Sequence, residues 1–191
     1  MRTAPALRRQ LLRAGLFLPW LGLGGGLATA QAPPESLGPL LERSWTIDRI
    51  RRRLSLRVPA MARGQLRERE ASYYWLGNAG RFNLSLIATA PDCQGGERHA
   101  QAADCFQSRL AGLPGQLADS IERQDLPDHS RLRYWQQVPW RDRQLRIRHL
   151  HLYLALQGHW VDVHASLVEP SATERPWFDA LGDSLELQRT D

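Results

Sequence analysis

Residues 144–168, QLRIRHLHLYLALQGHWVDVHASLV, decide the fold. Apolar and polar side chains alternate over 144–156 and again over 160–168, which is the period of a β-strand. Gln157-Gly158 between them predicts a two-residue hairpin turn. The turn makes one face of the hairpin apolar by pairing Leu154 with Val161, Leu152 with Val163 and Leu150 with Ala165.

The opposite face of this hairpin gathers histidines. The same register pairs His151 with His164, Tyr153 with Asp162 and His149 with Ser166. Imidazoles and a carboxylate are ligands of Zn or Cu, so His149, His151, His164 and Asp162 are a candidate metal site. Two alternatives stay open. One is a polar sheet face, either solvated or packed beneath a loop or helix, with hydrogen-bonded imidazoles. The other is a hydrolytic triad, although Ser166 lies mid-strand without a nucleophile elbow.

A segment rich in tryptophan and arginine precedes the histidines. Its candidate members for a ligand groove are Trp135, Trp140, Arg141, Arg143 and Arg146. Such a groove suits an anionic envelope polymer, a glycan or a protein partner. A solvated strand edge is the alternative. In a cytosolic protein the pattern would suggest RNA, but the export signal described below argues against nucleic acid.

The rest of the chain predicts an α+β domain over residues 44–191 after a flexible arm at 31–43. Strands are expected at 46–50, 54–58, 81–90 and 131–135, and helices near 99–111 and 174–185. We therefore expect a single antiparallel sheet of about five to seven strands, flanked by helices.

The two cysteines predict one disulfide. Cys93 and Cys105 stand twelve residues apart, and Gly95-Gly96 between them lets the loop fold back on the following helix. A lone pair without a CxxC spacing favours a disulfide over a zinc or redox pair in an oxidising compartment.

The first thirty residues predict export. A basic segment, residues 1–13, precedes an apolar stretch at 14–27, and Ala28-Thr29-Ala30 supplies a signal-peptidase site. Arg8-Arg9 followed by Gln10-Leu11-Leu12 resembles a twin-arginine signal, with general secretory export as the alternative. Pro19 and Gly24-Gly25-Gly26 interrupt the apolar stretch, so no transmembrane anchor is expected. We expect a periplasmic or secreted protein after cleavage near Ala30.

Net charge does not point to a polyanion-binding domain. The chain carries a formal charge of +5, but residues 1–30 hold four arginines and no acidic residue, which leaves 21 arginines against 20 acidic residues. The basic character therefore belongs mostly to the leader.

Three segments together resemble the PsbP-like α/β sandwich. They are the edge strand at 54–59, the hairpin at 158–164 and the helix at 178–185, and the resemblance spans about residues 44–188. It implies an antiparallel sheet flanked by helices. Members of that fold mostly act as non-catalytic binding or assembly factors, and some bind metals.

These observations predict an exported binding or accessory protein, without catalytic activity or a cofactor, that acts on an envelope component or a protein partner. One alternative is a metal-binding protein that uses the histidine face with Zn or Cu. Another is a periplasmic immunity-type inhibitor of a toxin. The sequence leaves the oligomeric state open.

Overall fold

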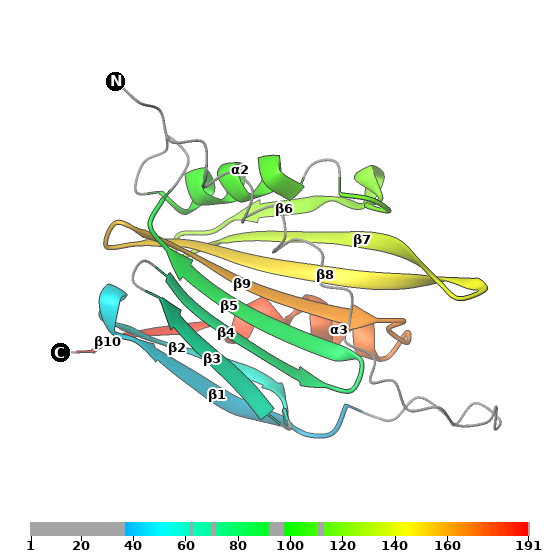
Figure 1. Ribbon diagram of the computed structural model, residues 1–191, viewed down its shortest axis with the longest axis horizontal. Coiled ribbons are helices and arrows are strands. Elements are labelled where there is room, and N and C mark those ends of the chain that lie inside the picture. Colours follow the sequence, from blue (N-terminus) through cyan, green and yellow to red (C-terminus); the bar gives the residue numbers. More distant parts are fainter. Residues whose placement is uncertain (1–36, 62, 70–71, 92–97, 111–112, 191) are drawn as a thin grey trace. The chain divides into compact units, whose positions relative to one another are not determined.

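The main element of the fold is an antiparallel seven-stranded sheet, in the order β3-β4-β5-β9-β8-β7-β6 (Figure 1). The computed structural model describes residues 37–61, 63–69, 72–91, 98–110 and 113–190. The strands of this sheet are β3 (Arg63–Arg69), β4 (Ser72–Ala79), β5 (Phe82–Thr89), β6 (Glu122–Asp125), β7 (Ser130–Trp140), β8 (Arg143–Leu156) and β9 (His159–Val168).

A second antiparallel sheet has three strands in the order β1-β2-β10. Its strands are β1 (Leu40–Ile47), β2 (Arg52–Pro59) and β10 (Glu186–Arg189). A short 3-10 turn, η1 (Asp48–Ile50), joins β1 to β2. Leu54, Leu56 and Val58 project from β2 into the core that both sheets share.

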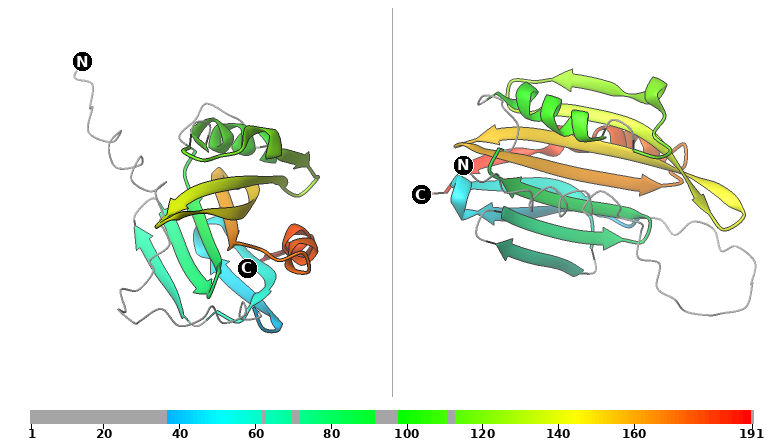
Figure 2. Two further views of the ribbon diagram at one scale, coloured as in Figure 1. Left: turned by 90° about the vertical axis from the view of Figure 1, so that its right-hand side faces the viewer. Right: turned by 45° about the horizontal axis from the view of Figure 1, so that its top comes forward.

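The seven-stranded sheet is covered differently on its two faces. One face packs on the three-stranded sheet, and on Phe178 and Leu181 of the C-terminal helical segment. That segment comprises α3 (Glu174–Asp179) and η3 (Leu181–Ser184). The other face carries α2 (His99–Leu110), which contacts β7 and β8. Figure 2 shows α2 and α3 on opposite sides of β7, β8 and β9. The central strands are thus buried on both faces.

The hairpin formed by β8 and β9 has the predicted register. Leu154 pairs with Val161, His151 with His164 and His149 with Ser166, so the expectation is confirmed. Gln157 and Gly158 have φ values of 48° and 72°, the positive angles that a type I′ turn requires. Turn chemistry and strand alternation therefore fix the same pairing.

The predicted α+β class with one sheet is wrong. The described residues are mostly β, with 58% in strands and 19% in helices, and they form two antiparallel sheets. The predicted C-terminal helix at 174–185 is divided, because α3 ends at Asp179 and the 3-10 turn η3 follows it. Gly182 in η3 approaches Leu152 and Arg131 so closely that a Cβ there would lie 2.8 Å from Leu152 Cδ2. The chain continues from η3 into β10, a third strand for the smaller sheet.

Several other predictions concern particular segments. Residues 40–43, assigned to an N-terminal arm, form the first half of β1. The export signal lies outside the described residues. Cys93 lies outside them as well, whereas Cys105 of α2 is not a free cysteine, so the Cys93–Cys105 pairing stays a prediction. Within the described residues, no helix has the length and apolarity needed to cross a bilayer.

Candidate functional site

The predicted histidine face exists, and its side chains bond to one another. His149 Nδ1 lies 2.9 Å from His164 Nε2, so one of these ring nitrogens donates a hydrogen bond to the other. His151 Nδ1 lies 3.0 Å from Asp162 Oδ1, and the Tyr134 hydroxyl lies 3.5 Å from His151 Nε2. A His151 protonated on Nδ1 satisfies both contacts, since it donates to the carboxylate and accepts from the phenol.

The rings of this face form a stack beneath α2. The His151 and His164 rings are 4.1 Å apart with their planes at 4°, and Tyr134 lies 4.7 Å from His149 at 11°. Phe106 of α2 closes the stack on Tyr153. Helix α2 is further fixed because His99 Nδ1 accepts a hydrogen bond from the Ala155 backbone N–H at 2.9 Å. The stack is therefore part of a second hydrophobic cluster beneath this helix.

This packing bears on the predicted metal site. Stacked rings direct their in-plane nitrogen lone pairs side by side, whereas a metal ion needs them to converge on one point. Within the described ranges, no group of three or more His, Cys, Asp or Glu side chains is placed to hold a metal ion. The geometry thus shows hydrogen-bonded imidazoles packed under a helix.

Burial keeps His149 and His164 neutral. Burial first, and then His151 and Arg148, lower the pKa of His149 from 6.5 to about 3. Burial, with His151 and His149, also lowers the pKa of His164 well below its usual value. Burial and the Asp162 carboxylate raise the pKa of Tyr134. Near neutral pH the two imidazoles are therefore uncharged and the phenol keeps its proton.

The tryptophan and arginine segment divides between two places. Arg146 lies over the Trp135 ring, with its Cζ 4.6 Å from the ring centroid. Trp140 and Arg141 pair separately at the turn between β7 and β8, where Arg143 is the register partner of Trp140. The two pairs lie at different positions along the β7–β8 ladder, and Trp135 and Arg146 are the pair that lies next to a pocket.

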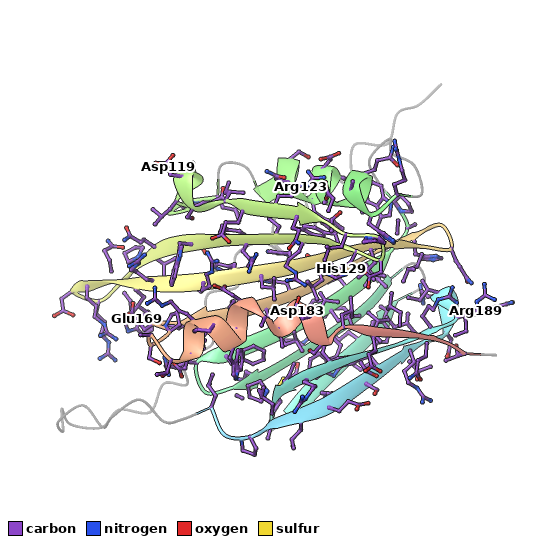
Figure 3. The ribbon with its side chains drawn as sticks, turned by 180° about the vertical axis from the view of Figure 1, so that it is seen from behind. Asp119, Arg123, His129, Glu169, Asp183 and Arg189 are labelled. Atoms are coloured by element: carbon purple, nitrogen blue, oxygen red, sulfur yellow. The ribbon has the colours of Figure 1, made fainter. Side chains whose placement is uncertain are left out.

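That pocket lies between α3 and the β6–β8 end of the seven-stranded sheet. Its volume is about 320 Å³. The apolar wall consists of Trp135, Ala172 and Pro176. The charged wall consists of Glu122, Arg148, Arg175 and Asp179. Figure 3 shows α3 crossing this face of the sheet. Glu169 lies near the start of the segment that contains α3, and Arg189 lies at the opposite end of the part of the chain that the structure describes.

Arg148 is the central charge of the pocket. Its side chain is only 4% exposed. Nε donates to Asp179 Oδ1 at 2.9 Å, and Nη2 donates to Glu122 Oε1 at 3.0 Å. Nη1 is buried without a hydrogen-bond partner, and the guanidinium carbon lies 5.3 Å from the Trp135 ring centroid. The ring therefore covers a guanidinium whose hydrogen-bonding capacity is not exhausted.

Sequence reasoning counted Arg148 only as one of the arginines of the tryptophan and arginine segment, and it missed Glu122, Arg175 and Asp179. A signal for Arg148 was present, because it shares the strand parity of Leu150, Leu152 and Leu154 and therefore points to the apolar face. An arginine at such a position needs a buried partner. No comparable local signal marks the other three residues, which reach the pocket only through the packing of α3 and β6.

Comparison with known proteins yields only distant structural likeness. No family model matches the chain, and no curated protein is significantly similar to it. LpqN, described as involved in cell envelope biogenesis of Mycobacterium tuberculosis, superposes with a TM-score of 0.42 at 13% identity, over 80% of this chain and 92% of that one. A protein from Bacteroides thetaiotaomicron gives 0.36 at 9% identity, over 71% of this chain and 45% of that one. Such values carry no statement about function.

Proposed function

We propose that the mature chain is an exported binding protein that holds an envelope component or a protein partner at the Trp135 pocket. The leader sequence supports export, because a basic segment, an apolar stretch and Ala28-Thr29-Ala30 follow one another in the order of a signal peptide. The pocket supports binding, because it combines an aromatic wall with a few fixed charges.

The observation that carries the proposal is the buried Arg148 at the floor of this pocket. A guanidinium held on two sides by Asp179 and Glu122 cannot rotate freely, so the site is arranged before a ligand arrives. Binding without turnover fits this arrangement. The imidazoles suited to acid–base chemistry bond to one another beneath α2, on the other face of the sheet.

A binding assay with separated envelope fractions tests the proposal. Purified exported protein is incubated with isolated peptidoglycan, with envelope lipids and with envelope proteins. We expect one fraction to retain it, and Trp135→Ala to reduce retention while circular dichroism shows an intact fold. Arg189→Gln, a change at a distant exposed arginine of β10, is the matched control.

Two results would contradict this function. Equal retention of Trp135→Ala and the unchanged protein would place binding elsewhere. Retention by none of the three fractions would remove the envelope role. If the retained molecule is a toxin protein, the function becomes that of an immunity-type inhibitor at the same pocket.

A further inference from the structure

We infer that the Trp135 pocket recognises an anionic oxygen group, a carboxylate or a phosphate, on a small ligand or on one unit of a polymer. The inference rests on the proposed function, since it assumes that this pocket is the binding site. It concerns the chemistry that the pocket selects, which follows from how its charges are already paired.

The two carboxylates of the pocket are engaged by the protein itself. Glu122 accepts from Arg148 through Oε1 and lies 3.5 Å from Arg133 Nε through Oε2. Asp179 accepts from Arg148 through Oδ1, and its backbone oxygen accepts from Arg133 Nη1 at 3.3 Å. Negative charge in the pocket is therefore compensated before any ligand enters, and a cationic ligand would have to displace an arginine.

Two guanidiniums remain available. Arg175 lines the pocket from α3 and is exposed, and Arg146 is exposed beside the Trp135 ring. In the described ranges neither side chain forms an ion pair.

The pocket wall itself holds two arginines, Arg148 and Arg175, against Glu122 and Asp179. Arg148 engages both carboxylates, and Arg133 contacts Glu122 from outside the lining, so Arg175 is the lining guanidinium left without an acidic partner. Guanidinium forks match the geometry of carboxylates and phosphates, so this unpaired arginine favours an oxyanion.

The apolar wall limits the body of that ligand. Trp135, Ala172 and Pro176 offer flat, apolar contact next to the arginines. A volume of about 320 Å³ is at the lower end for ligand pockets. The pocket therefore suits an acidic group attached to a single ring or residue, such as an acidic sugar unit, more than an extended polyanion.

The test uses four sugars as probes of the exported protein, followed by the indole and arginine side-chain signals in nitrogen-15 NMR spectra. Galacturonate supplies a carboxylate, glucose 6-phosphate supplies a phosphate, and galactose and glucose are the neutral controls. We expect an anionic sugar to shift the Trp135 indole signal at concentrations where the neutral sugars do not. Arg175→Gln should weaken that binding on the order of tenfold, and Arg189→Gln should leave it unchanged.

The outcomes are distinguishable. A response to galacturonate alone identifies a carboxylate as the group that the pocket recognises. A response to glucose 6-phosphate alone identifies a phosphate. Equal response to neutral sugars, or no response to either anion, overturns the inference. The protein could instead be retained, in a Trp135-dependent way, by an envelope component that is neutral or cationic. That result would support the proposed function and contradict the inference that the pocket selects an anionic group.

Discussion

Acidification should destabilise this protein through its stacked histidines. The pKa of His149 is lowered from 6.5 to about 3 by burial, and the pKa of His164 is also lowered. The unfolded chain takes up a proton at each histidine below about pH 6.5, whereas the folded chain does not. Stability is therefore fully present above that pH and falls as the pH drops toward the folded pKa.

The size of the effect follows from the width of this window. Each pH unit costs about 1.4 kcal/mol for each histidine that protonates only on unfolding. Between about pH 6.5 and 5, His149 alone should remove about 2 kcal/mol, and His164 should add a loss in the same direction. A loss of about 2 kcal/mol is already a substantial part of the 5–15 kcal/mol typical of folded domains.

Urea unfolding at several pH values between about 7 and 5 measures this slope. In His149→Phe the ring stack is kept and one titrating group is removed, so the slope should fall by about 1.4 kcal/mol per pH unit. His164 loses its partner in that variant, which lowers stability at every pH. Burial remains the largest cause of the lowered pKa of His164, so part of the original slope should persist. His159→Gln, at the turn outside the stack, should keep the original slope.

Two results would refute this reasoning. A free energy of unfolding that stays flat between about pH 7 and 5 would mean that the histidines titrate alike in both states. An unchanged slope in His149→Phe would mean that the acid sensitivity arises at other groups.

Three further predictions concern stability, each measured by urea unfolding at neutral pH. Gly115→Ala should destabilise by more than about 1 kcal/mol, because its Cβ would overlap the carbonyl oxygen of Gln137 in β7. Gly158→Ala meets no atom and should cost only about 1 kcal/mol for its positive φ. Equal costs would contradict the close approach. Phe82→Ala should cost about 3–5 kcal/mol, since this ring is fully buried in the shared core, and a cost below about 1 kcal/mol would mean that the core is packed differently. Asp179→Ala should destabilise more than Arg148→Met, because the first leaves a buried guanidinium short of a partner and the second removes the buried charge. The reverse order would show that Arg148 is not buried as a charge.

The sequence predicts the β8–β9 hairpin in full and the rest of the fold only in part. Strict alternation and a Gln-Gly turn specify that pairing locally, so no tertiary information is needed. Strands β3, β6 and β10 carry mostly polar residues, and β6 and β10 have four residues each. Such strands form because the edge of a neighbouring strand is available for pairing. The periodicity of the sequence does not reveal that edge.

In the candidate site, too, the features set by local strand pairing are predictable from the sequence, and those set by tertiary packing are not. Cross-strand pairing brings His151 and His164 together as predicted, but ring stacking and hydrogen-bond direction depend on the helix packed above them. The pocket joins β8 to α3 and β6, which lie far apart in the chain. A prediction based on local spacing therefore finds Trp135 and Arg146, and misses the acidic residues that hold Arg148.

The burial of strand β8 changes along its length, so its histidines are enclosed while Arg146 near its start is exposed. Over 149–154 the strand is buried on both faces, and the histidines there bond to His164 and to Asp162. His149 Nε2 and the Tyr153 hydroxyl are buried without a hydrogen-bond partner. Toward Arg146 the core ends, and the apolar-facing parity carries arginines in place of leucines. Charges at that end can be paired yet still approached by solvent. A binding site built on this strand therefore belongs at its arginine end, and the histidines contribute to stability instead.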